Sequence, residues 1–333
     1  MPDPKRILVV KLSALGDLFH AMPVVHRLSD HYGCKVDWVT QPEYAELVSC
    51  HEDVDRVLEF PRKGGLKDSR NFLRQLRIRE YDLALDLQGL AKSGLVLGLC
   101  RARRKIGSSC PREGSALFAG ETPKAFAKTP HALDQLFDSL RHLKVETEPV
   151  CYPLRFPDVP ELVEDPSPVL AMAPRSRWPA KDWPKEHFQS LGEKMIKEMG
   201  AQVWVLGGLD DRELGEELVE SLGENARNLC GKYPILALGP LLRKVDCLLC
   251  NDSGPMHFAA AVETPLVALF GPTDPARTGP WSERAIVLRP DPGPQGFPDP
   301  RSYKHGTNEF ISRIEVAEVF QAVYQQLQKT RSK

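Results

Sequence analysis

Three consecutive polar residues in the second half of the chain follow a short apolar run. The run, residues 247–250, predicts a parallel strand covered on both faces, and Asn251, Asp252 and Ser253 end it. A glycine and a proline then open the alanine-rich stretch MHFAAAVE, which predicts a helix whose first amides are capped by Asp252 or Ser253. Free amides and the positive end of a helix dipole attract anions, most often a phosphate.

The neighbouring segments place more polar groups at the same edge of the predicted sheet. His257 lies one helical turn after Ser253 and therefore faces the same side. A second apolar run, residues 266–270, ends in the loop GPTDP. Open α/β sheets bind ligands at this edge. Because any helix needs a cap, and a single helix histidine is more often structural, the local pattern leaves both a phosphate site and a plain cap open.

The start of the chain repeats the arrangement of strand, glycine turn and helix. Residues 6–12 predict the first strand, which breaks at the turn from Ser13 to Asp17 before an amphipathic helix. The turn lacks the G-x-G-x-x-G pattern, so it disfavours a nicotinamide dehydrogenase. Asp17 is expected to be either a helix cap or a general base held at the edge of the sheet.

Composition is that of an ordinary globular protein. The chain has 333 residues, 42% of them hydrophobic and 27% charged, with a net charge of -1, which argues against a general nucleic-acid binder. It has no apolar run long enough to span a bilayer and no signal-peptide pattern, so a cytoplasmic location is expected. The Cys247-x-x-Cys250 pair lies within a strand and is interpreted as core, and no metal site is expected.

Strands alternate with helices along both halves of the chain, which predicts an α/β fold with parallel sheets. Predicted strands occupy residues 36–40, 57–60, 82–89, 169–174 and 203–208, and a helix covers 132–145. The proline-rich passage 149–168 reads as a linker. We therefore expect two Rossmann-like doubly wound domains, residues 1–155 and 156–312, and a terminal helix in 313–333 that packs back on the N-terminal domain.

Two basic clusters fall in the first half. Residues 62–79 are dense in positive charge, and Arg101, Arg103, Arg104 and Lys105 follow later. A solvated face explains much of this charge, but two clusters in one half favour a surface for an anionic partner, such as acidic headgroups or a phosphorylated glycolipid. The candidate residues for binding this partner are Ser13, in the first turn, and Arg62, Lys63, Arg70 and Arg104.

Five motifs occur in order over nearly the whole chain, and together they resemble glycosyltransferase family 9, the bacterial lipopolysaccharide heptosyltransferases. They are VVKLSALGD, SRWPAKDWPKEHF, GGLDDRE, NDSGPMHFAAA and FGPTDP. The resemblance implies a GT-B fold, with two Rossmann-like domains facing across a cleft. It implies an inverting, metal-independent transfer without a cofactor, from ADP-heptose to the inner core, onto Kdo-lipid A or heptosyl-Kdo-lipid A. The acceptor would be an anionic glycolipid at the inner face of the cytoplasmic membrane.

The resemblance also assigns individual residues. Asp17 would be the general base, and Ser176 and Lys181 would contact the diphosphate. Asp211 would hold the ribose, with Asp210 as the competing position. The element D-[ST]-G-x-x-H at the sugar and diphosphate would be formed by Asp252, Ser253, Gly254 and His257. Arg177 departs from the family, because many members carry a second small hydroxyl residue after Ser176.

Other functions remain open at this point. A sugar-nucleotide epimerase on the same architecture would also have phosphate loops, although the basic clusters would then have no purpose. A transferase could use another nucleotide sugar, and a non-catalytic binder would use Asp17 only as a cap.

Overall fold

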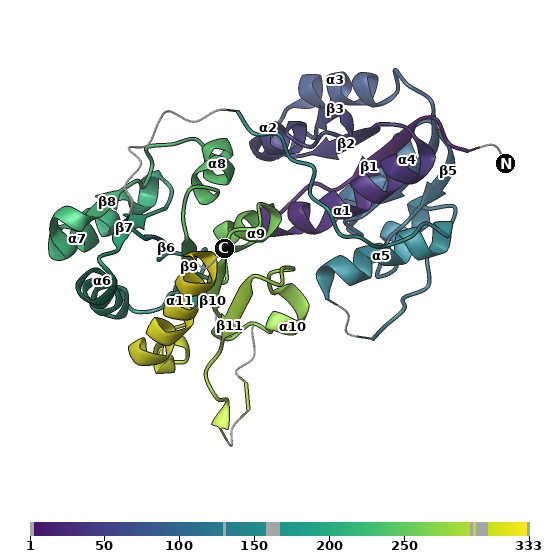
Figure 1. Ribbon diagram of the computed structural model, residues 1–333. Helices are drawn as coiled ribbons and strands as arrows, with labels where there is room; N and C mark the ends of the chain where they lie inside the picture. Colours follow the sequence, from purple (N-terminus) through teal and green to yellow (C-terminus); the bar gives the residue numbers. More distant parts are fainter. Residues whose placement is uncertain (1–2, 129–130, 158–166, 294–295, 298–305, 332–333) are drawn as a thin grey trace. The chain divides into compact units, whose positions relative to one another are not determined.

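The computed structural model describes residues 3–128, 131–157, 167–293, 296–297 and 306–331. The chain forms two compact units, Met1–Arg155 and Phe156–Lys333 (Figure 1). Each unit is built on a parallel sheet flanked by helices, which confirms the predicted pair of Rossmann-like α/β domains.

The first unit contains a five-stranded sheet in the order β3-β2-β1-β4-β5. The strands are β1 Ile7–Val10, β2 Val36–Thr40, β3 Val54–Glu59, β4 Tyr81–Asp86 and β5 Ala102–Ile106, and the helices are α1 Leu15–Tyr32, α2 Pro42–Ser49, α3 Leu66–Leu76, α4 Ala91–Leu99 and α5 Ala132–Leu143. Leu8 and Val10 of β1 pack in one core cluster with residues of α3 and α4. Ile7 and Val9 alternate with them and are equally buried, so both faces of the sheet are covered.

The second unit contains a six-stranded sheet in the order β11-β10-β9-β6-β7-β8. Its strands are β6 Val169–Ala173, β7 Gln202–Val205, β8 Ala226–Asn228, β9 Cys247–Asn251, β10 Leu266–Leu269 and β11 Ala285–Leu288. Its helices are α6 Lys185–Met199, α7 Arg212–Leu222, α8 Leu238–Leu242, α9 Gly254–Ala261, α10 Pro275–Thr278 and α11 Val316–Arg331.

The cysteines of β9 belong to the core, as predicted. Cys247 and Leu249 share a hydrophobic cluster with residues of α6, α7 and α11, and Cys250 points to the opposite, equally buried face. Burial raises the pKa of the Cys247 thiol far above its ordinary value. A buried, protonated thiol packs as a small hydrophobe.

In each sheet there is one point where the order in which successive strands are added changes direction. In the first unit the strands run outward from β1 through β2 to β3, and outward from β4 to β5, so the reversal lies between β1 and β4. In the second unit it lies between β6 and β9. Ligands of open α/β sheets bind beyond the carboxyl ends of the strands at such switch points.

One expectation about the elements needs revision. Arg101 to Lys105 were assigned only as a basic cluster, yet residues 102–106 form β5 at the edge of the sheet, where charged side chains are common. Helix α11 packs on α6 and β10 of the second unit. Its packing on the first unit stays a prediction, and residues 158–166 of the linker lie outside the described residues.

Among the helices of the described residues, none combines the length and the hydropathy that a bilayer-spanning segment requires.

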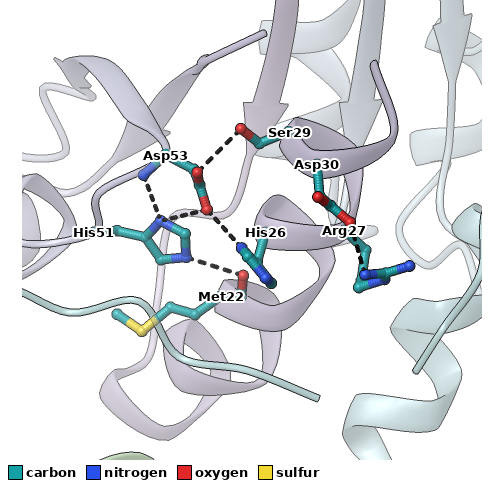
Figure 2. Close-up of polar contacts among 7 residues, drawn as sticks. All are labelled: Met22, His26, Arg27, Ser29, Asp30, His51 and Asp53. Carbon is teal, nitrogen blue, oxygen red and sulfur yellow. Dashed lines mark hydrogen bonds and ion pairs between the residues drawn. The ribbon is translucent and has the colours of Figure 1, made fainter. Parts of the chain in front are cut away.

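A histidine pair and an aspartate join α1 to the segment after α2 (Figure 2). Asp53 accepts from the Ser29 hydroxyl at 3.1 Å and lies 2.8 Å from Nδ1 of His26. The buried His51 accepts the amide of Asp53 at Nδ1, so its other nitrogen, Nε2, carries the proton and donates to the Met22 carbonyl at 3.1 Å. His51 is thus held in its neutral form.

This histidine predicts an acid-dependent loss of stability. Burial lowers the pKa of His51 to about 4 from an ordinary value of 6.5. Between these two values the unfolded chain binds a proton that the folded chain does not. The free energy of unfolding should therefore fall as the pH drops through this window, by at most about 1.4 kcal/mol per pH unit from this group. Urea unfolding at a series of pH values measures the slope.

The variant His51→Gln should flatten the slope between pH 6.5 and 4, whereas His31→Gln, at an exposed position, should leave it unchanged. An unaltered slope in His51→Gln would show that other groups cause the acid sensitivity.

Candidate active site

Asp17 lies at the carboxyl end of β1, in the first turn of α1. Its Oδ2 atom accepts the amide of Ala14, the N-cap residue, at 3.0 Å. Within the described part of the chain, Oδ1 has no hydrogen-bond partner, and the side chain is partly exposed. The aspartate therefore caps the helix with one oxygen and presents the other to solvent, so the cap and the base are compatible roles.

Ser13, at the same turn, is held by the next strand across the switch point. Its amide donates to Oε1 of Gln88 at 3.2 Å, and Gln88 follows β4. Lys11 is 6% exposed, and its Nζ atom donates to the carbonyl of Leu87 at 3.0 Å. The sequence analysis assigned no role to Gln88 or Lys11. Lys11 follows an apolar run within the predicted first strand, and this position could have indicated a buried cation.

Arg62 and Lys63 follow β3, so they lie at the same edge of the sheet as Asp17. Both line a cavity of about 880 Å³, together with residues from the end of β3 and along α3, among them the carboxylates of Glu59 and Asp68, and with Glu43 of α2. The two cations thus stand beside a space large enough for a sugar-sized ligand.

Arg70 occupies the exposed side of α3. It borders a shallow depression with Leu73, Arg74, Arg77 and Ile78, and Ile78 is 60% exposed. This side of α3 combines positive charge with apolar side chains, as the amphipathic basic pattern predicted.

The structure does not bring Arg104 to the edge that carries Asp17. Its guanidinium forms two hydrogen bonds to Glu121, of 2.6 and 2.7 Å, which lowers the pKa of that carboxyl to about 2. Arg104 also interacts with Tyr32 at the C-terminal end of α1. Asp17 lies 15 residues earlier in this helix, roughly 22 Å away along its axis. An acceptor would have to displace Glu121 to bind Arg104.

The second switch point brings Lys181 and Asp252 together. Lys181 belongs to the loop after β6, Asp252 follows β9, and the Nζ–Oδ2 distance is 2.5 Å with both side chains largely buried. Asp252 also accepts the hydroxyl of Thr273 from the loop after β10, at 2.6 Å. Thr273 lies in the GPTDP loop, where no site residue was assigned. Three strand ends thus meet around one carboxylate, as the two polar loops predicted.

The predicted capping of α9 is wrong in its detail. Ser253 is the N-cap residue, but its hydroxyl donates to the Asn251 carbonyl at 3.2 Å, and Asp252 is engaged with Lys181. No side chain of the described residues caps α9. Pro255 has no N–H, and the amide of Met256 donates to the Ser253 carbonyl at 3.2 Å. Within the described residues, the amide of Gly254 is therefore the first-turn group available to an anion, at the positive end of the helix dipole.

Asn251, at the end of β9, holds the loop that follows β6. It is fully buried, its amide group donates to the Pro174 carbonyl at 2.8 Å, and its Oδ1 accepts the amide of Trp183 at 3.2 Å. Within the same loop Ser176 donates its amide to Asp182 at 2.7 Å and its hydroxyl to the Trp178 carbonyl at 2.9 Å. The loop that carries Lys181 is therefore held from both ends.

The remaining predicted residues occupy distinct positions. His257 is buried in the second turn of α9. Asp211 accepts the amide of Gly208 at 2.8 Å at the end of the loop after β7, whereas Asp210 is exposed. The ribose role of either aspartate stays a prediction. In the described residues, no group of three histidine, cysteine or carboxylate side chains is arranged to hold a metal ion.

Two doubly wound parallel-sheet units, each with polar loops at its switch point, have the architecture of GT-B glycosyltransferases. Comparison with known proteins identifies the family. Residues 69–296, more than half of the chain, match the description "Glycosyltransferase family 9 (heptosyltransferase)". The chain belongs to this family and is a glycosyltransferase, which confirms the resemblance and decides against the epimerase and the non-catalytic binder.

Relatives of known activity cover most of the chain. It is 29% identical over 312 residues to lipopolysaccharide heptosyltransferase 1 of Pseudomonas aeruginosa, covering 86% of this chain and 84% of the relative. It is 28% identical to lipopolysaccharide heptosyltransferase 2 of Escherichia coli K12, covering 85% and 88%. The structure of E. coli heptosyltransferase WaaC with ADP superposes with a TM-score of 0.81 at 23% identity, covering 96% and 99%, and thereby supports the fold. WaaC has also been solved with ADP-2-deoxy-2-fluoro heptose, with a TM-score of 0.78 at 22% identity, covering 96% and 99%.

Proposed function

We propose that the protein transfers heptose from ADP-heptose to a sugar hydroxyl of the lipopolysaccharide inner core, on Kdo-lipid A or heptosyl-Kdo-lipid A. The transfer inverts the anomeric configuration and needs no metal ion. The names of the lipopolysaccharide heptosyltransferase relatives support the heptosyl group and the acceptor class. The ligands of WaaC, ADP and a fluorinated ADP-heptose, support the donor.

The observation that carries the proposal is the uncapped start of α9 beside Lys181. A nucleoside diphosphate leaves with added negative charge, and this charge is stabilised by an ammonium group and by a free backbone amide at the positive end of a helix dipole. Both lie at the switch point of the second sheet, where the diphosphate would bind. Lys181 would then exchange part of its contact with Asp252 for the phosphate oxygens.

Asp17 supplies the second half of the chemistry. A sugar hydroxyl is a poor nucleophile until a base removes its proton as the new bond forms. The free oxygen of Asp17 would take that proton, while the other oxygen stays bound to the Ala14 amide. One carboxylate acting directly on the acceptor gives a single displacement, and therefore inversion at the anomeric carbon.

The acceptor would bind over the first unit. Arg62 and Lys63, in the cavity at the same edge as Asp17, would contact its anionic groups. Replacing both by glutamine should raise the acceptor KM and leave the donor KM unchanged, and steady-state kinetics measure the difference. A change in the donor KM alone would show that Arg62 and Lys63 bind the donor and not the acceptor.

The exposed side of α3 would rest on the cytoplasmic face of the inner membrane, which places the enzyme in the cytoplasm as a peripheral protein. Arg70, Arg74 and Arg77 would meet acidic headgroups, and Ile78 would reach the boundary of the acyl chains. Co-sedimentation with phosphatidylglycerol vesicles tests this contact, and equal binding to neutral vesicles would contradict it.

The central catalytic prediction concerns Asp17→Asn. Asparagine keeps an acceptor oxygen for the Ala14 amide but cannot take a proton at neutral pH, so kcat should fall by about 10² to 10⁴-fold. The affinity for ADP should stay unchanged. Transfer of radiolabelled heptose and calorimetric titration with ADP measure the two quantities.

Asp246→Asn is the matched control. Asp246 also accepts one backbone amide, that of Val169 at 2.8 Å, and it lies at the amino end of β9, away from the ligand edge of the second sheet. It should keep full activity. Retained turnover in Asp17→Asn would exclude the base.

A second prediction concerns the donor site. Lys181→Met should weaken ADP binding by about 10 to 100-fold, because one charge-assisted contact to phosphate is lost. It also leaves Asp252 without its cation. The control is Lys194→Met. The ammonium group of Lys194, on α6, lies over the ring of Phe320 on α11, and Lys194 belongs to no loop at the ligand edge of the sheet. Titration with ADP, and with UDP and GDP for selectivity, measures the effect. Equal affinity for all three nucleotides would contradict the adenine donor.

A further inference from the structure

The loop after β4 completes the hydrogen bonding of the turn that carries Asp17. Regular pairing of β1 with β4 ends at Val10 and Asp86. The next two free amides, those of Leu12 and Ser13, converge on a single atom, Oε1 of Gln88, at 3.1 and 3.2 Å. At the switch point a side chain therefore replaces the missing strand partner.

Gln88 and Asp17 act on successive amides of one turn. Gln88 accepts those of Leu12 and Ser13, and Asp17 accepts that of Ala14 through Oδ2, at 3.0 Å. Three consecutive amides are thus bound by two side chains. A shift of the turn relative to β4 would carry the Asp17 carboxylate with it.

Gln88 is itself fixed by buried contacts. The carboxylate of Asp86, 1% exposed, accepts the amides of Gln88 and Gly89 at 2.8 and 3.0 Å and the hydroxyl of Ser93 at 3.0 Å. Gly89 has a φ of +71°, and an added Cβ would lie 2.8 Å from Cβ of Ser108. The loop therefore has little freedom to move its glutamine.

Lys11 ties the same two elements a second time. Its buried ammonium donates to the Leu87 carbonyl, one residue before Gln88, and interacts electrostatically with Asp17 and Asp86. Burial lowers the pKa of Lys11, and the two carboxylates oppose that shift. Lys11 therefore holds the loop after β4 against the strand that leads into the Asp17 turn.

We propose that Gln88 is the positioning residue for Asp17: it fixes the Leu12–Ala14 turn so that the free carboxylate oxygen meets the acceptor hydroxyl. This inference rests on the proposed function, in which Asp17 is the base. A misplacement of about 1 Å in such a group costs on the order of 100-fold in rate. Gln88 touches no reacting atom in this scheme, so its effect is transmitted through the turn.

The test compares Gln88→Met and Gln88→Glu in the full chain. Methionine has a similar length but no strong acceptor, so kcat should fall by about 10 to 100-fold with the donor KM unchanged. Glutamate restores an acceptor oxygen for both amides and should recover most of kcat. Its negative charge should also raise the pH at which the acid limb of kcat/KM falls, because a nearby anion disfavours ionisation of Asp17.

The outcomes separate this inference from the proposed function. If Asp17→Asn is inactive but Gln88→Met keeps kcat within about twofold, the positioning role is wrong. If Asp17→Asn is active, the base assignment fails whatever Gln88 does. Should Gln88→Met not fold, Gln88→Asn decides alone: its shorter side chain withdraws the acceptor oxygen from the amides of Leu12 and Ser13, so a folded variant with kcat within about twofold of the wild type would overturn the inference.

Discussion

At a switch point of a parallel sheet, backbone groups beyond the strand ends lose their regular partners, and side chains must supply new ones. This constraint shapes both candidate sites of the protein. In the first unit Gln88 accepts two amides of the β1–α1 turn. In the second unit Asn251 bonds the loop after β6 through a carbonyl and an amide. Asp17 follows the turn that Gln88 holds, and Lys181 lies in the loop that Asn251 holds.

The two edges differ in the charge they offer. In the second unit, Lys181 and the Gly254 amide at the start of α9 present positive charge, and Asp252 holds the lysine in place. In the first unit, Oδ2 of Asp17 is bound to the Ala14 amide, and Oδ1 of the same carboxylate is free to act on a ligand. One edge suits a leaving diphosphate and the other suits a hydroxyl that must lose its proton. A transferase of the proposed kind needs both.

Much of this architecture could be predicted from the sequence. Strands buried on both faces are often continuous apolar runs, so β9 and β10 were predicted to within a few residues. Strand β2 was predicted with its observed bounds, although Asp37 interrupts its apolar residues. The carboxyl ends of adjacent parallel strands share one edge, so Lys181 and Asp252 could be expected near each other. The family motifs added the individual roles. Edge strand β5 was missed because its three consecutive cations, Arg103, Arg104 and Lys105, obscure the strand pattern.

The rest depends on contacts between segments far apart in the chain. Gln88 binds amides 75 and 76 residues away, and a glutamine after a strand has no local signal for that role. Arg104 looked available as part of a basic cluster, yet Glu121 binds it from a later segment. Ser253 looked like a helix cap, but its hydroxyl turns to Asn251. In each case the side chain has a partner that only the folded chain provides.

The central claim is that one carboxylate acts directly on the acceptor hydroxyl, in a single displacement without a metal ion. The most direct measurement is the anomeric configuration of the transferred sugar. It is read from the one-bond carbon–proton coupling at the anomeric carbon, after reaction with a donor of known anomer in the presence of EDTA. The account predicts undiminished transfer with inverted configuration. Retained configuration, or a reaction abolished by EDTA and restored by a divalent metal, would contradict it.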